Sequence, residues 1–355
     1  MWRRVVVRLL SGIALVLAVV TVAFVLLQLA PGDPARFWVG PAATQDDLET
    51  ARRALGLDRP LLTRYLAWVT GFVRGDWGSS LAQHRPVREV LGAALPATLL
   101  LSGTSLLVTY LGGIIVGLVQ AVKRARPVDT LLTIVTVVVY GLPAYWVALV
   151  LVLVFAYAAA RLGWPAWLQF PAMGVQSLDA DFLSPGARLL DRLEHLALPL
   201  VTLGALGVAG TARFVRGAAL DVLTLDFVRA ARARGISGRR VLTRHVLRNA
   251  LLPVITLLGL ALPALFSGTV FVEVIFAWPG MGRELVGAVA ARDYPVVLAA
   301  TAVFGTLVVT GNLLADLLYA VADPRMRAGR EGREGRVRAR GGAWGRGAQH
   351  EQEGP

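Results

Sequence analysis

The chain has 355 residues, 56% of them hydrophobic, with a mean hydropathy of +0.62 and a formal net charge of +13. A soluble domain is about 45–50% apolar, and here the excess lies in charge-poor blocks of about 20 residues, the length that crosses a bilayer. Cysteine is absent, which excludes disulfides, thiolate metal sites and cysteine nucleophiles.

Six segments are long and apolar enough to be transmembrane helices. They are residues 5–29, residues 97–122, and stretches within 128–160, 193–215, 250–271 and 296–321. As one helix the third block would be about 50 Å long, and Gly141 and Pro143 predict a kink in it. The first segment is too long for the apolar region of a signal peptide, so residues 1–30 are expected to be an uncleaved span. The sequence thus predicts an all-α polytopic membrane protein with six transmembrane helices.

The distribution of basic residues predicts the orientation of these spans. Six spans place both termini on one side, and the segments on that side hold 23 of the 36 Lys and Arg residues. Cytoplasmic segments collect Lys and Arg, so both termini are expected to be cytoplasmic. Residues 31–96 then form an external loop, long enough for helices of its own, and residues 97–323 form the transmembrane domain. The Gly- and Arg-rich tail, residues 324–355, is expected to be disordered and cytoplasmic.

A cytoplasmic loop, residues 216–249, joins the fourth and fifth spans. Asp226 can cap a short helix rich in Ala and Arg, Gly235 stands where a left-handed residue would end it, and Ser237 can cap a second helix. The predicted unit is a helix, a tight turn and a helix at the membrane surface. Such a unit can transmit force to a partner protein, or it can simply cover the helix bundle; the residues alone leave both open.

The loop resembles that of binding-protein-dependent ABC transporter permeases. Against the general family motif only Ala231, Gly235 and Leu247 match, whereas residues 231–235 and 244–253 resemble the dipeptide, oligopeptide and nickel class almost throughout. Further segments that resemble this class are residues 31–34, 55–60, 75–78, 95–98, 278–282, 292–296 and 316–325. The chain is therefore identified as a member of that class, as the permease with the long first external loop.

The resemblance implies a type I ABC importer permease. Such a permease pairs with a second permease, more often a different one, and with two cytoplasmic ATPase subunits, while an external binding protein delivers the solute, here a peptide or a related molecule. The implied ATPase-coupling residues are Asp226, Phe227, Ala230, Ala231, Arg232, Gly235 and Ile236. The chain has no phosphate-binding loop of the G-x-x-x-x-G-K-[ST] type, so ATP hydrolysis is expected on separate subunits, with no catalytic residue in this chain.

Two acidic residues near the ends of spans are candidates for the translocation path, because ionisable groups in membranes are usually functional. They are Glu273, after the fifth span, and Asp316, late in the sixth. Structural roles are the favoured interpretation: Glu273 can cap the turn at 278–280, and Asp316 can hydrogen-bond within the bundle. The four histidines show no i, i+4 pair, so neither a metal site nor a cofactor is expected.

Two other classes of protein fit six spans. An ion-gradient-driven secondary transporter would usually show inverted repeats with broken helices in matching places, and the sequence shows no such symmetry. An intramembrane enzyme would need a catalytic motif such as His-Glu-x-x-His or Gly-x-Ser-x-Gly, and the spans contain neither. The importer permease therefore remains the main hypothesis and the secondary transporter the alternative.

Overall fold

A computed structural model describes residues 2–29, 33–40, 42–247, 249–250, 254, 258 and 269–322 of the chain. Over these residues the protein is almost entirely helical, and the sole β element in them is an isolated bridge between Ser79 and Pro86. The helices are α1 (Trp2–Leu29), α2 (Pro34–Val39), α3 (Gln45–Ala54), α4 (Leu61–Arg74), α5 (Val87–Val122), α6 (Pro127–Gly141), α7 (Ala144–Leu151), α8 (Ala159–Arg161), α9 (Pro185–Leu223), α10 (Asp226–Ala233), α11 (Gly238–Val241), α13 (Val270–Ile275), α14 (Met281–Ala290) and α15 (Tyr294–Ala322). The predicted all-α class is confirmed.

Five helical segments in the described part are long and apolar enough to cross a membrane. They are Val6–Leu29, Val87–Val122, Ala144–Arg161, Pro185–Leu223 and Tyr294–Ala315. The predicted fifth span, within 250–271, lies mostly outside the described residues. With 36 and 39 residues, α5 and α9 are about 54 and 58 Å long, well beyond the bilayer core of about 30 Å. These two helices therefore extend past the membrane surface.

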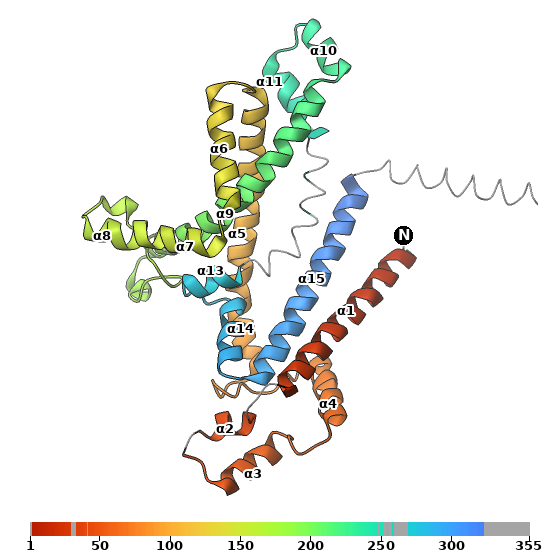
Figure 1. Ribbon diagram of the computed structural model, residues 1–355, viewed down its shortest axis with the longest axis vertical. Coiled ribbons are helices and arrows are strands. Elements are labelled where there is room, and N and C mark those ends of the chain that lie inside the picture. The colour runs from red at the N-terminus through yellow and green to blue at the C-terminus, as the bar shows by residue number, and fades with distance from the viewer. Residues whose placement is uncertain are drawn as a thin grey trace, which may run out of the picture.

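The third predicted span is broken into two helices rather than kinked. Helix α6 ends at Gly141, Leu142 is extended (φ −84°, ψ 138°), and Pro143 is the N-cap of α7. Proline disfavours the helical conformation in the residue before it and has no amide hydrogen to continue the helical bonding. In Figure 1, α7 runs crosswise to α6. A π-helical turn, Val152–Ala158, continues α7 into α8.

Two helix pairs build the body of the molecule. Helix α9 packs along α5, and α1 packs along α15 (Figure 1). The α5–α9 contact is close because glycines of α5 face α9: a Cβ on Gly113 would lie 2.5 Å from Cβ of Thr211, and one on Gly117 would lie 2.7 Å from Cβ of Val215. Small residues let helix backbones approach in this way.

The two pairs meet at one end of the molecule, where α5, α14 and α15 bury a shared apolar cluster. Its members include Val87, Leu91, Met281, Val296 and Ala299. Helices α2 to α4, from the predicted external loop, lie at this same end, and helices α10 and α11 lie at the opposite end (Figure 1). This arrangement agrees with the prediction that residues 31–96 and the loop after the fourth span are on opposite sides of the membrane.

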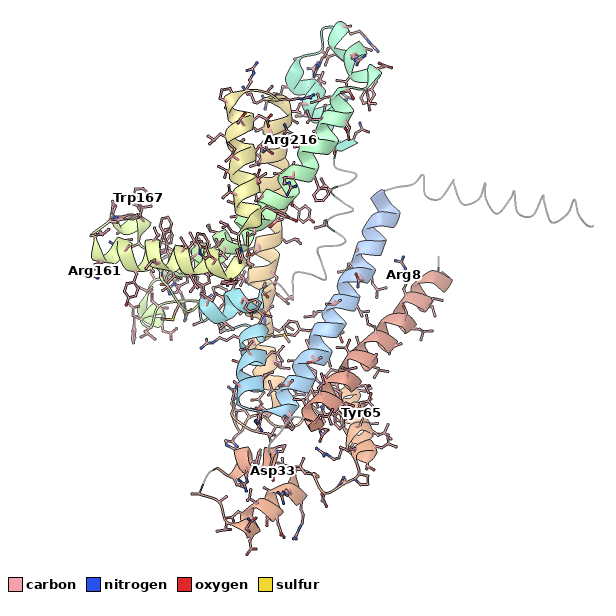
Figure 2. All side chains as sticks on the ribbon, viewed as in Figure 1. Arg8, Asp33, Tyr65, Arg161, Trp167 and Arg216 are labelled. Atoms are coloured by element: carbon pink, nitrogen blue, oxygen red, sulfur yellow. The ribbon has the colours of Figure 1, made fainter. Side chains whose placement is uncertain are left out.

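Helix α4 is tied to α1 by aromatic and polar contacts. The hydroxyl groups of Tyr65 and Thr21 are 2.6 Å apart, and the Tyr65 ring packs edge-on against Phe24. Figure 2 shows Tyr65 beside the end of α1. The segment between α1 and α5 is therefore packed on the spans and not merely tethered to them.

Candidate coupling loop

Helix α10 is short because its sequence stops it after two turns. Gly235 has φ +76°, a left-handed conformation that favours glycine. The Ile236 amide donates to the Ala231 carbonyl (3.2 Å), and the Gly235 amide donates to the Arg232 carbonyl (2.9 Å). These two bonds form a Schellman motif, which satisfies the last carbonyls of the helix. The left-handed conformation predicted for Gly235 at the end of the helix is confirmed.

The capping details differ from the prediction at both helix starts. Leu225 is the N-cap of α10, and Asp226 stands in the first turn with its side chain exposed, 3.7 Å from the Arg229 guanidinium. Ser237 is the N-cap of α11, but its side chain makes no capping bond. An acidic side chain in the first turn still favours the helix, because it complements the positive end of the dipole.

Apolar contacts hold the inner face of α10 on the bundle. Val228 and Ala231 are buried with Ala219 and Val222 of α9 and with Val241 of α11, and Ala121 at the end of α5 joins this cluster. Ile236 packs against it. A movement of α10 away from the bundle would expose these side chains, so apolar burial favours keeping α10 in place on α9 and α11.

The outer face of α10 is exposed. Of the predicted coupling residues, Asp226, Phe227, Ala230, Arg232 and Gly235 are exposed, and the Phe227 side chain is 43% exposed. Arg232 also lines a cavity between α10, α11 and the ends of α5 and α9. Ala231 is 5% exposed and faces the bundle. The predicted set therefore divides into a surface that a partner could reach and an inner pair, Ala231 and Ile236, that holds the helix in place.

Glu273 lies in a closed polar cluster where α13 and α14 meet α5. Its carboxylate is fully buried and accepts hydrogen bonds from the Thr98 hydroxyl (2.8 Å) and from the amides of Gly282 (2.7 Å) and Arg283 (3.2 Å). The last two amides belong to the first turn of α14, where a carboxylate complements the helix dipole. A Cβ on Gly282 would lie 2.8 Å from this carboxylate, so the glycine is required by contact.

The second candidate for the path, Asp316, belongs to α15, but its side chain lies outside the described residues. A role for either residue in translocation remains a prediction. The bonds above favour a structural role for Glu273, but its carboxylate caps the start of α14 and not the turn at 278–280 as predicted.

Sequence reasoning missed an ion pair near the coupling loop. Arg216 of α9 donates from Nε and Nη2 to the two carboxylate oxygens of Asp129 on α6, both at 3.0 Å. Asp129 also accepts from the Ala125 amide (3.1 Å), and Figure 2 shows Arg216 where α9 passes α6. Ionisable residues in or near spans are usually functional or paired with one another. Applied to Asp129 and Arg216, this rule could have identified both as candidates.

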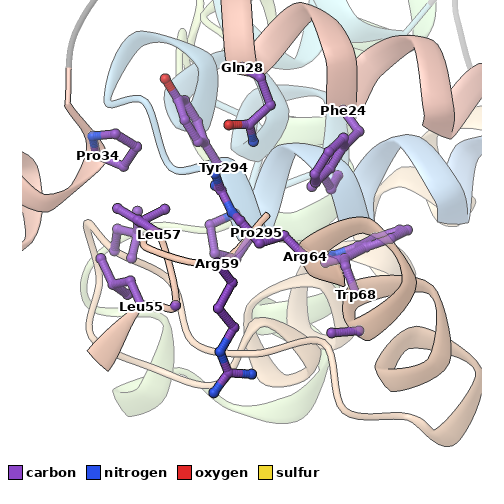
Figure 3. A pocket seen from close by; sticks show the side chains of 14 residues that line it. Phe24, Gln28, Pro34, Leu55, Leu57, Arg59, Arg64, Trp68, Tyr294 and Pro295 are labelled. Carbon is purple, nitrogen blue, oxygen red and sulfur yellow. The ribbon is translucent and has the colours of Figure 1, made fainter. Parts of the chain in front are cut away.

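A pocket of about 220 Å³ lies where α1, α4 and the start of α15 meet (Figure 3). Phe24, Trp68 and Tyr294 supply apolar walls, and Arg64 contributes a guanidinium group. Partial burial lowers the pKa of Arg64 from its ordinary value. The pocket belongs to the end of the molecule opposite the coupling loop.

Comparison with known proteins agrees with this architecture. Residues 113–328 match the family model of the binding-protein-dependent transport system inner membrane component, and residues 1–102 match the N-terminal model of the same kind of membrane component. The oligopeptide transport system permease protein AppB of Bacillus subtilis is 39% identical over 320 residues, covering 90% of this chain and 97% of the relative.

Two further relatives have similar coverage. The di/tripeptide transport system permease protein DppB of Pseudomonas aeruginosa is 37% identical over 86% of this chain and 92% of its own length. The glutathione transport system permease protein GsiC of Escherichia coli K12 is 37% identical over 90% of this chain and 97% of its own.

The long apolar helices of the described residues are those of a multi-pass membrane protein. The chain belongs to the family of binding-protein-dependent transport system inner membrane components. It is thus a transport subunit of an ABC importer and not an enzyme, and the resemblance found in the sequence is confirmed.

Proposed function

We propose that this permease imports peptides, di- or oligopeptides, across the inner membrane of a bacterial cell. The support is the relatives above, whose names give oligopeptides, di/tripeptides and glutathione as their solutes. All three carry peptide bonds, and the chain is similar to each relative over most of its length.

The proposed driving force is ATP hydrolysis on two separate cytoplasmic subunits, with α10 as the contact. The observation that carries this is the combination of an exposed outer face with a buried inner face that packs on α5 and α9. A helix held on its inner face moves the helices beneath it when a partner moves its outer face. Phe227 supplies an apolar contact, Ala230 allows close approach, and Ala231 and Ile236 fix the helix.

The proposed assembly contains a second, different permease and an external solute-binding protein. Helices α10 and α11 and both termini, with the tail 324–355, are placed on the cytoplasmic side, as the basic residues of those segments favour. The external region is residues 31–96 and the transmembrane domain residues 97–323. In this orientation α2 to α4 face the binding protein.

Substitution at Gly235 tests the coupling role. Gly235→Val places a β-branched residue at φ +76°, which costs roughly 1–2 kcal/mol or more and shifts the end of α10. The assembled transporter should still hydrolyse ATP, but peptide uptake per ATP hydrolysed should fall at least about tenfold.

The matched control is Gly238→Val, three positions along. Gly238 begins α11 with no left-handed φ, and a Cβ there meets nothing within 4 Å. It should leave coupling close to wild type. Normal uptake per ATP in Gly235→Val, or equal losses in the two variants, would remove the support for α10 as the coupling element.

A further inference from the structure

A cavity of about 560 Å³ lies beneath the coupling loop. Its floor is apolar and comes from the ends of α5 and α9 and from α11, with Val122, Leu220 and Val241 among the lining residues. Its rim carries three arginines from three different segments: Arg124 after α5, Arg232 of α10 and Arg239 of α11. The cavity therefore joins the helix bundle to the loop that rests on it.

The charge of this cavity is of one sign. Among its described lining residues none is acidic, and none of the three guanidinium groups pairs with a carboxylate of a described residue. Of the acidic residues on neighbouring segments, Asp129 binds Arg216 and Asp226 lies beside Arg229, while Asp221, next to Leu220 on α9, is exposed and does not line the cavity. Three clustered cations without a counter-charge favour an anionic ligand.

The position of the cavity along the spans indicates where that ligand comes from. Arg124 stands in the turn between α5 and α6, and directly after it α6 exposes an apolar face that includes Val128, Leu131 and Ile134. Arginine near the end of a span holds its guanidinium at the level of the lipid headgroups. With Arg124 at headgroup level, the apolar lining residue Val122, one turn or less before it at the end of α5, is within reach of the start of an acyl chain.

We propose that this cavity binds the headgroup of an anionic phospholipid from the cytoplasmic leaflet, with the phosphate at Arg124, Arg232 and Arg239 and the start of an acyl chain on the apolar floor. Basic pockets on the cytoplasmic side of membrane proteins bind such headgroups. The bound lipid bridges α5 to α10 and α11, so it stiffens the coupling loop. The inference rests on the proposed cytoplasmic position of the loop.

The test is lipid binding to the purified full-length chain, without ATP turnover, so that it is independent of any failure in coupling. The chain in detergent is titrated with phosphatidylglycerol or phosphatidylcholine, and bound lipid is measured by native mass spectrometry. Wild type should bind one phosphatidylglycerol at least about tenfold more tightly than phosphatidylcholine. Arg124→Gln/Arg239→Gln should weaken this on the order of thirtyfold, the equivalent of two lost cation contacts.

The matched control is Arg126→Gln/Arg240→Gln. It removes the same charge from neighbouring exposed positions on the same segments, outside the cavity lining. It should change phosphatidylglycerol affinity by less than about threefold, as partly screened surface charges do. Size-exclusion profiles and melting temperatures of both double variants should match wild type, which excludes unfolding as the cause.

Three results would overturn the proposal. An equal loss of phosphatidylglycerol affinity in the two double variants would mean that a general basic surface attracts the lipid and that the cavity is not a specific site. Displacement of the lipid by millimolar inorganic phosphate would assign the cavity to a free anion. Complete release of the lipid when the ATPase subunits bind would assign the arginines to a protein interface.

Discussion

Glu273 illustrates how a single buried charge is made tolerable. A carboxylate without solvent is costly unless hydrogen bonds and opposite charge compensate for it. Here Thr98, on α5, and two amides at the start of α14 do so, and the Thr98 hydroxyl also accepts a hydrogen bond from the Met281 amide (2.8 Å). One side chain therefore joins α5, α13 and α14.

Replacing Glu273 with Gln should destabilise the protein. The amide group of Gln brings donors to a place where donors already point, and charge-assisted bonds are lost. We expect a loss of about 2–4 kcal/mol in the free energy of unfolding, measured by thermal unfolding of the purified chain. The conservative control Glu89→Gln, at an exposed side chain of α5, should be near neutral. Unchanged stability with abolished transport would instead assign Glu273 to the translocation path.

At the scale of helices, the α5–α9 contact sets the relative position of the two helix ends on which α10 packs. Gly113 lies directly against Thr211, so Gly113→Ala must push the two helices apart. We expect a loss of about 1–3 kcal/mol, as for overpacking in a core. Gly103→Ala, on the same helix with nothing within 4 Å of the added Cβ, should be neutral or stabilising by up to about 1 kcal/mol. Thermal unfolding of both variants checks this, and equal effects would contradict the packing described.

The Asp129–Arg216 pair joins α6 to α9 at the first residue of the predicted cytoplasmic loop, residues 216–249. Arg216→Gln leaves Asp129, whose side chain is 7% exposed, without its cation. The expected loss is about 2–3 kcal/mol, below that for a fully buried pair because Arg216 is partly exposed. Asp129→Asn/Arg216→Gln should lose less than the sum of the two single variants in a double-mutant cycle of unfolding free energies. Additive losses would show that Asp129 and Arg216 have no interaction free energy in the folded protein.

At the scale of the whole molecule, the question is what energy source moves these helices. The proposed importer predicts that uptake of a labelled dipeptide into right-side-out vesicles requires internal ATP and the external binding protein. An ionophore that collapses ion gradients should leave that uptake largely intact. Uptake that continues without ATP and stops with the ionophore would favour the secondary transporter.

The sequence by itself determined the membrane class, most of the spans and the short helix that Gly235 terminates. These follow from local rules, because the length of an apolar stretch and a left-handed glycine depend on neighbouring residues only. It also predicted a break near Pro143, though as a kink in one helix rather than the separation of α6 from α7.

Only the tertiary structure decided which groups meet across the chain. Asp129 and Arg216 are 87 residues apart, and Thr98 and Glu273 are 175 apart, so no local pattern could pair them. The division of the predicted coupling residues into exposed residues and an inner pair, the buried Ala231 and the partly buried Ile236, likewise depends on how α10 rests on α9 and α11. Burial and pairing are properties of the packed bundle, and the physical reason is that they arise only when distant helices come into contact.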